Sequence, residues 1–151
     1  MIDNKPMNTG RCRCGEVTFE ARGEPVMTSA CHCRGCQRMS GSAFSLTALF
    51  PMDGFVVTKG SPVIGGLRGA TQHFFCPDCL SWLFTRPADT DAFVGVRSSL
   101  FDNAQGYAPF METWTQTRLP WAGTGANVSY EAFPEASEYP ALMAAFRNVS
   151  S

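Results

Sequence analysis

Seven cysteines fall into three tight clusters, and this arrangement constrains the fold more than any other feature of the chain. The clusters are Cys12-x-Cys14, Cys31-x-Cys33-x-x-Cys36 and Cys76-x-x-Cys79. Two or three thiolates within a few residues converge readily on one soft metal ion. Zn²⁺ suits them best, because it takes cysteine sulfur at about 2.3 Å in tetrahedral geometry. The sequence therefore predicts a fold organised around bound zinc.

A disulfide framework is the alternative reading of a cysteine-rich chain. Three features argue against it: the number of cysteines is odd, residues 1–10 are polar and lack the apolar stretch of a secretory signal, and the members of a Cys-x-Cys pair reach disulfide geometry only with strain. Metal binding is the favoured interpretation. It also predicts a cytoplasmic location, where thiols stay reduced.

The count of seven matches one closed four-sulfur site and one three-sulfur site with a vacant position. Cys12 and Cys14 would point to one face of an extended segment, and Cys76 and Cys79 have zinc-knuckle spacing. Together these two pairs would close one site, although the sequence leaves other pairings open. Closed zinc sites are usually structural and open ones catalytic, so the count indicates a zinc enzyme with two ions per chain.

Length and charge limit the other possibilities. A chain of 151 residues is expected to form one domain, and its net charge of −1 gives no general attraction to nucleic acid or to an acidic membrane surface. The longest apolar stretch, residues 43–52, is too short to span a bilayer. We therefore expect neither a nucleic-acid nor a membrane partner, and the sequence does not indicate an oligomeric state.

Short runs of alternating apolar and polar residues, separated by Gly and Pro, predict a mainly β fold. The expected strands are residues 17–21, 44–50, 55–58, 72–75, 81–85, 92–96 and 111–117. One helix is expected at residues 139–147, with Ser137 as its N-cap and Pro140 in its first turn, and a short helical turn at residues 35–39. We divide the chain into a flexible N-terminus (1–9), a zinc-binding domain (10–135) and a C-terminal helix and tail (136–151).

Several segments of the chain resemble the glutathione-dependent formaldehyde-activating family, which shares its domain with centromere protein V. They are residues 10–19 (GRCRCGEVTF), 31–36 (CHCRGC) running on to Ser40-Gly41-Ser42, and 75–79 (FCPDC), with weaker similarity at residues 94–96, 100–102 and 118–121. The resemblance implies a compact single domain of folded-over antiparallel sheets, stabilised by zinc.

The resemblance also implies roles for the cysteines. It implies a structural zinc on Cys12, Cys14, Cys76 and Cys79, and a catalytic zinc on Cys31, Cys33 and Cys36. The family's named reaction adds the glutathione thiol to formaldehyde and is classed as a carbon–sulfur lyase reaction. One residue departs from the family pattern: Leu80 stands where the family usually has Gly, so we expect the turn after Cys79 to avoid a left-handed conformation.

Several other residues near the clusters each have two alternative roles. Arg34 and Arg38 flank Cys36 and would either pair with a substrate carboxylate or serve as ordinary surface charge. His32 is expected to point away from the metal as a packed histidine, whereas His73 could donate to a sulfur or be a partly buried strand residue. The tryptophans Trp82, Trp114 and Trp121 are expected in the core, with Trp121 at a pocket mouth as the alternative.

The sequence thus favours an enzyme that adds a glutathione-like thiol to formaldehyde or another small aldehyde. The open zinc would bind the thiol as a thiolate, which attacks the aldehyde carbon. The proton donor is not identified; His32, Tyr107 and Asp102 are candidates. The alternatives are a zinc-stabilised binding module without catalysis and a redox or metal-buffering protein.

Overall fold

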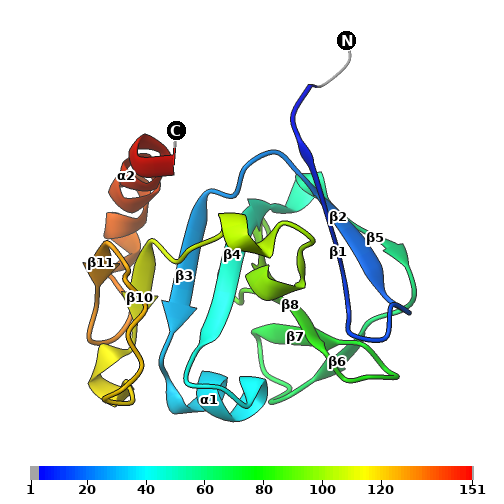
Figure 1. The fold of residues 1–151 in the computed structure, drawn as a ribbon, viewed down its shortest axis with the longest axis horizontal. Coiled ribbons are helices and arrows are strands. Elements are labelled where there is room, and N and C mark those ends of the chain that lie inside the picture. Colours follow the sequence, from blue (N-terminus) through cyan, green and yellow to red (C-terminus); the bar gives the residue numbers. More distant parts are fainter. Residues whose placement is uncertain (1–3, 151) are drawn as a thin grey trace.

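The strands form two sheets in the computed structural model, which describes residues 4–150 (Figure 1). The smaller sheet has the order β1-β2-β5 and consists of β1 (Met7–Arg11), β2 (Thr18–Arg22) and β5 (Phe55–Lys59). The larger sheet has the order β11-β10-β3-β4-β9-β8-β7-β6. Its strands are β3 (Met27–Cys31), β4 (Ser45–Pro51), β6 (Val63–Gly65), β7 (Gln72–Phe75), β8 (Trp82–Arg86), β9 (Phe93–Arg97), β10 (Met111–Thr113) and β11 (Val128–Ser129).

The mainly β prediction is confirmed, with two differences in the larger sheet. Strands β3, β4, β9, β8, β7 and β6 pair antiparallel, but β10 pairs parallel with both β3 and β11. The expected strand 111–117 ends early because Trp114 adopts a φ of 60° and a short 3-10 turn follows at Thr115–Thr117. Strands β1, β3, β6 and β11 were not expected from the sequence.

Strand β1 begins inside the segment that the sequence analysis assigned to a flexible N-terminus. The side-chain amide of Asn8 is buried and donates to the carbonyls of Ala21 (3.0 Å) and Gly23 (2.7 Å). Residues 7–9 therefore belong to the smaller sheet, while residues 1–3 lie outside the described part of the chain.

Two α-helices flank the larger sheet: α1 (Arg34–Ser40) and α2 (Tyr139–Ser150). Both were expected, and Pro140 does lie in the first turn of α2. The predicted cap at Ser137 is wrong, because Ser137 lies inside a 3-10 turn (Ala136–Glu138) that leads into α2. That turn is instead closed by a capping box, in which the Glu135 amide donates to the Glu138 carboxylate at 2.7 Å. Further short 3-10 turns are Met52–Gly54, Ser98–Leu100 and Ala104–Gly106.

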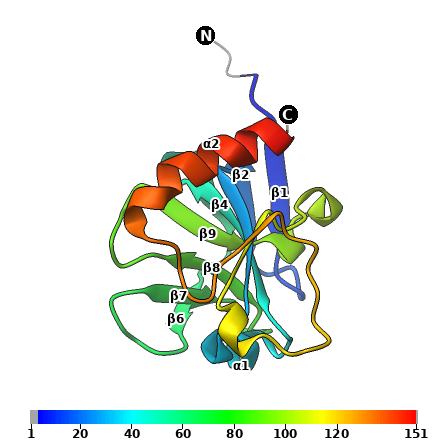
Figure 2. The ribbon, with the colours of Figure 1, turned by 90° about the vertical axis from the view of Figure 1, so that its left-hand side faces the viewer.

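The main core lies between the two sheets. Side chains from β2, β4, β9 and β8 meet there, and its largest fully buried members include Phe19, Phe50 and Leu83. A second cluster joins α2 to β3 and β10 through Leu142 and Phe146, which pack with Met27, Phe110 and Met111. Helix α2 runs across the top of the molecule in Figure 2. No helix in residues 4–150 is long and apolar enough to cross a membrane.

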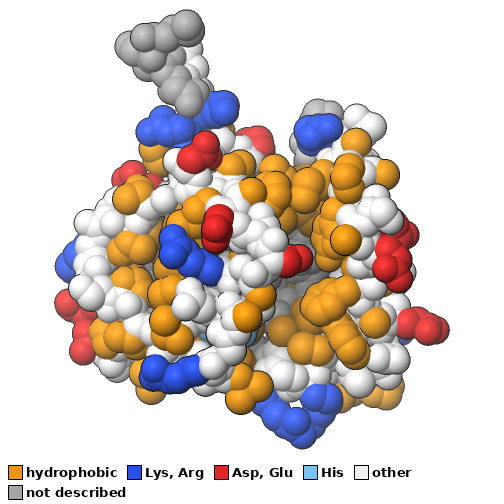
Figure 3. Space-filling view, turned by 180° about the vertical axis from the view of Figure 1, so that it is seen from behind, with side chains coloured by type: hydrophobic (Ala, Val, Ile, Leu, Met, Phe, Trp, Pro, Cys, Tyr) orange, Lys and Arg blue, Asp and Glu red, His pale blue; other side chains and the backbone are white. Residues whose placement is uncertain are grey.

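Strand alternation gives the larger sheet a second face, turned away from the smaller sheet. On β9, Val94 and Val96 point into the core, so Gly95 and Arg97 point the other way. Seen from behind, this side of the molecule is hollowed between the part that carries α2 and the rest, and hydrophobic side chains gather along the hollow (Figure 3).

Candidate metal centres and the cavity beside them

Four cysteines from two distant segments meet at one point. Cys12 and Cys14 lie in the loop after β1, Cys76 and Cys79 lie in the turn between β7 and β8, and their sulfurs all lie within 4.8 Å of one another. The Sγ–Sγ distances are 3.6 Å for Cys12–Cys14 and 3.8 Å for Cys14–Cys76. Tetrahedral zinc with bonds of about 2.3 Å separates its sulfurs by about 3.8 Å, so this cluster fits a zinc ion.

Backbone amides support the sulfurs of this four-cysteine cluster. The amides of Val17 and Cys79 donate to Cys12 Sγ (3.3 Å) and Cys76 Sγ (3.5 Å). Such bonds favour the thiolate form that a metal requires. Cys12 and Cys76 are almost completely buried, and all seven cysteines of the chain are free rather than joined in disulfides. The preference for metal binding over a disulfide framework therefore agrees with the structure.

The expectation for Leu80 is wrong. Leu80 has a φ of 61°, in the left-handed region, and its amide donates to the Cys76 carbonyl at 3.0 Å. The hydrogen bonds of the knuckle fix this backbone conformation regardless of the side chain. Leu80 therefore keeps the turn geometry that glycine would adopt without strain.

The second cluster brings together Cys31, Cys33 and Cys36, whose sulfurs also lie within 4.8 Å of one another. Cys31 ends β3, Cys33 is the N-cap of α1, and Cys36 lies in the first turn of α1, where its amide donates to Cys33 Sγ at 3.2 Å. All three are partly buried. Three convergent thiols with no fourth Cys, His, Asp or Glu within reach in the described chain form a donor set that fits a soft metal ion with one open position.

Two thiols of this three-cysteine cluster, those of Cys31 and Cys36, shift each other's pKa through a hydrogen bond. Hydrogen bonding, above all from the Cys36 thiol, lowers the pKa of Cys31 to about 5. The same interaction with Cys31 raises the pKa of Cys36 far above its ordinary value. Without metal, Cys31 is therefore the thiolate and Cys36 retains a proton, which a metal ion must displace on binding.

A buried hydrogen-bond network holds residues 31–33, on the side of the segment away from the sulfurs. His32 points away from the sulfurs, as expected, and its Nε2 donates to Glu112 of β10 at 2.8 Å. The His32 carbonyl accepts from Gln37 Nε2 (2.9 Å) and Thr117 Oγ1 (3.0 Å). The other oxygen of Glu112 accepts from Ser129 at 2.8 Å. The segment between Cys31 and Cys33 is thus fixed to α1, β10 and the turn beyond it.

A cavity of about 280 Å³ opens beside Cys31 and Cys36 on the free face of the larger sheet. Its wall is mainly apolar and includes Met27, Leu49, Trp82, Met111, Phe133 and Tyr139. Hydroxyl groups line the floor near the sulfurs, among them Ser45, Thr47 and Thr113. The cluster therefore faces a space large enough for a small organic ligand.

Among residues 4–150, Arg97 is the one arginine that lines this cavity, and it was not among the site residues expected from the sequence. Its guanidinium lies 4.0 Å above the Trp82 ring, and the residue is only 9% exposed. Burial lowers the pKa of Arg97 to about 10, while Cys36 and Cys31 act in the opposite direction, so Arg97 is cationic at neutral pH. Strand alternation was the available signal, because Arg97 follows Gly95 on the face opposite Val94 and Val96.

Residues 7–117, well over half of the chain, match the family described as "Glutathione-dependent formaldehyde-activating enzyme". This chain belongs to the glutathione-dependent formaldehyde-activating family. A crystal structure of a Rhodobacter sphaeroides protein shares the fold, with a TM-score of 0.53 and 18% identity over 81% of this chain and 98% of that chain. No curated protein matches the chain.

The structure also places four other residues whose roles were considered from the sequence: Arg34, Arg38, His73 and Trp121. Arg34 is exposed and contacts Gln37, and Arg38 is exposed; neither lines the cavity. His73 does line it, with Nδ1 2.9 Å from Thr85 Oγ1 rather than near a sulfur. Trp121 is 75% exposed, so its expected place in the core is wrong.

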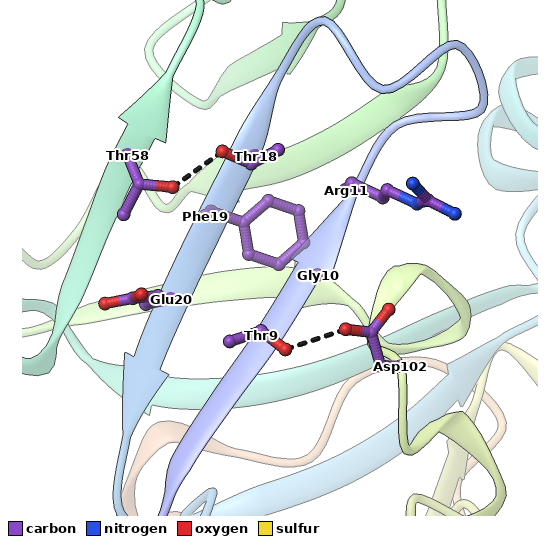
Figure 4. Close-up of a pocket in the computed structure, with 8 residues that line it drawn as sticks. All are labelled: Thr9, Gly10, Arg11, Thr18, Phe19, Glu20, Thr58 and Asp102. Atoms are coloured by element: carbon purple, nitrogen blue, oxygen red, sulfur yellow. Dashed lines mark hydrogen bonds between the residues drawn. The ribbon is translucent and has the colours of Figure 1, made fainter.

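A second hollow lies on the outer side of the smaller sheet, and none of the seven cysteines lines it (Figure 4). Four of its polar side chains pair with one another: Thr9 donates to Asp102 at 2.7 Å, and the Thr18 and Thr58 hydroxyls are 2.7 Å apart. Asp102 is therefore occupied here, while Tyr107 packs against Phe50 and Phe101. None of the three candidate proton donors, His32, Tyr107 and Asp102, lines the cavity beside Cys31.

Proposed function

We propose that this protein is a zinc-dependent enzyme of the carbon–sulfur lyase type, which adds a glutathione-like thiol to formaldehyde or another small aldehyde. The observation that carries the proposal is that the three-cysteine cluster of a formaldehyde-activating family member faces a cavity of about 280 Å³. A purely structural metal site would have no need of an adjoining space.

Two zinc ions per chain follow from this proposal. Cys12, Cys14, Cys76 and Cys79 would hold a structural ion, and Cys31, Cys33 and Cys36 would hold an ion with one exchangeable position. When bound there, zinc lowers the pKa of an incoming thiol so that it is a thiolate at neutral pH. We also propose a cytoplasmic location, because glutathione is abundant and cysteines stay reduced there.

The chain's own residues would position the reactants. The thiol sulfur forms the new bond to the aldehyde carbon, the carbonyl oxygen takes up a proton, and the product is an S-hydroxymethyl thioether. The thiol proton leaves on binding, so the overall addition is balanced. The hydroxyl groups of Thr113 and Ser45 interact with Cys31 and Cys36, so they would lie beside a reactant bound at the cluster. Arg34 and Arg38, one helical turn apart, remain candidates for a carboxylate at the outer end of glutathione.

The test combines spectroscopy with turnover. In cobalt-substituted protein, adding glutathione should change the d–d spectrum of one metal ion and leave the other unaltered. Wild-type zinc protein should then consume formaldehyde in a thiol-dependent way, and Cys36→Ser should remain folded but lose this activity. Unchanged spectra at millimolar glutathione, together with no thiol-dependent loss of formaldehyde or other small aldehydes, would contradict the proposal and leave a non-catalytic binding module.

A further inference from the structure

The cavity beside Cys31 and Cys36 is far larger than formaldehyde requires. A water molecule takes about 30 Å³ of liquid volume, and formaldehyde, with two heavy atoms, is only slightly larger. About 280 Å³ is thus several times the volume that formaldehyde would fill. This open hollow has a mainly apolar wall, and covering it with an apolar body would remove apolar surface from water, so the wall indicates a reactant with a sizeable apolar body.

Arg97 gives this apolar cavity one fixed positive charge. Its Nη2 makes only long hydrogen bonds, 3.4 Å to Thr85 Oγ1 and 3.4 Å to the Gly95 carbonyl. Its Nε is buried without a hydrogen-bond partner, and no carboxylate within residues 4–150 forms an ion pair with it. Burying a guanidinium whose N–H groups lack acceptors costs free energy, unless an anion accepts hydrogen bonds from those groups.

The surroundings of Arg97 hold the guanidinium ready for such an anion. Trp82 supports one face of the guanidinium at 4.0 Å, and His73 packs edge-on against the same ring at 5.3 Å. Burial, with a further contribution from Arg97, lowers the pKa of His73, so this imidazole is neutral at pH 7 and adds no second charge. Arg97 is thus the one cationic side chain lining the cavity at neutral pH.

We propose that this cavity binds a reactant with a compact apolar body and one carboxylate, and that Arg97 pairs with the carboxylate while the reacting atom lies at Cys31, Cys33 and Cys36. The proposal rests on the proposed thiol addition and names the substrate class of that site. The carboxylate belongs either to the thiol or to the aldehyde, and the two sources share this recognition chemistry.

Two pairs of probe ligands distinguish whether the carboxylate belongs to the thiol or to the aldehyde. Their binding is measured by titration calorimetry on the metal-loaded protein. The thiol pair is 3-mercaptopropionate and 3-mercaptopropan-1-ol, and the aldehyde pair is 4-carboxybenzaldehyde and 4-(hydroxymethyl)benzaldehyde. In at least one pair the carboxylate should bind about ten- to a hundredfold more tightly than the alcohol, as expected for a charged hydrogen-bonded pair. Equal affinities within both pairs would overturn the proposal.

Two variants of Arg97 test whether this residue causes the tighter binding of the carboxylate. Arg97→Met should abolish the preference for the carboxylate while leaving the affinity of the alcohol within about threefold, and Arg97→Lys should retain part of it because a point charge replaces a bidentate fork. A role only in offsetting the charge of the cysteine thiolates would weaken both members of a pair equally, which would refute the proposal. Thermal melts and metal content check that each variant is folded and loaded.

Wild-type protein supplies an independent readout in case Arg97→Met does not fold. The ¹⁵N resonance of Arg97 Nε should shift on adding the favoured carboxylate and stay unchanged with its alcohol partner; no shift with either carboxylate would contradict the proposal. These outcomes do not depend on turnover. Carboxylate binding without thiol addition would reject only the proposed function, and turnover without a carboxylate preference would reject only this inference.

Discussion

At the scale of single residues, the backbone of Leu80 stores avoidable strain. Its φ of 61° is a conformation that costs residues with a Cβ about 1–2 kcal/mol, whereas glycine adopts it freely. The Leu80 side chain is 67% exposed, so removing it sacrifices little buried area. Leu80→Gly should therefore raise the free energy of unfolding by about 1 kcal/mol, measured by urea denaturation of the zinc-loaded protein.

The matched control for that variant is Leu67→Gly. Leu67 is 86% exposed and does not have a positive φ, so glycine there only adds conformational freedom to the unfolded chain. This control should be neutral or slightly destabilising. If both variants change stability equally, the left-handed conformation of Leu80 is not the cause.

His73 should titrate abnormally. Burial, followed by repulsion from Arg97, places the pKa of His73 below its ordinary value near 6.5. The unfolded chain therefore binds this proton more readily, so His73 costs no stability above about pH 6.5 and costs progressively more as the pH falls towards its folded-state pKa. Arg97→Met should raise the pKa of His73 in an NMR titration. Arg86→Met, which removes an exposed charge from β8, should leave it unchanged, and the reverse pattern would show that Arg97 does not act on His73.

At the scale of elements, the buried pair His32–Glu112 connects the end of β3 to the parallel strand β10. His32 is fully buried and the Glu112 side chain is 7% exposed, so neither can turn to water if its partner is lost. Glu112→Met should lower the free energy of unfolding by about 2 kcal/mol and weaken metal binding at the three-cysteine cluster. Glu112→Gln keeps an acceptor for His32 and should cost less, as urea denaturation can establish. Equal losses for the two variants would show that the hydrogen bond to His32 is not what matters.

Elements formed by local patterns were predictable, and those formed by distant contacts were not. The arms of the β7–β8 hairpin are short runs rich in aromatic residues that flank a cysteine turn, so sequence alone predicts them. Strand β3 reads Met27–Cys31 (MTSAC), which has no clear alternation, and it becomes a strand because β4 and β10 pair with it on either side. The spacing of the cysteines in the sequence predicts their clusters. Arg97, in contrast, lines the cavity only because the fold places that face of β9 beside the three-cysteine cluster.

At the scale of the whole molecule, the two clusters tie together different parts of the fold. The four-cysteine cluster links the loop after β1 in the smaller sheet to the β7–β8 turn in the larger sheet. The three-cysteine cluster joins only the end of β3 to the adjacent helix α1. If both clusters hold metal as proposed, loss of metal from the first would remove one tie between the two sheets, and loss of metal from the second would loosen a single loop.

If the protein holds the two zinc ions proposed above, graded chelation should proceed in two distinct steps. The ion at Cys31, Cys33 and Cys36 should leave first, because three sulfurs and an exchangeable position bind less tightly than four sulfurs, and circular dichroism should change little. The second ion should leave only with cooperative unfolding, since structural zinc energy is folding energy, on the order of 10 kcal/mol in zinc-finger peptides. Cys76→Ser should mimic the second step and Cys36→Ser the first, as thermal melts would report. A native-like Cys76→Ser protein beside an unfolded Cys36→Ser protein would reverse the roles assigned to the two clusters.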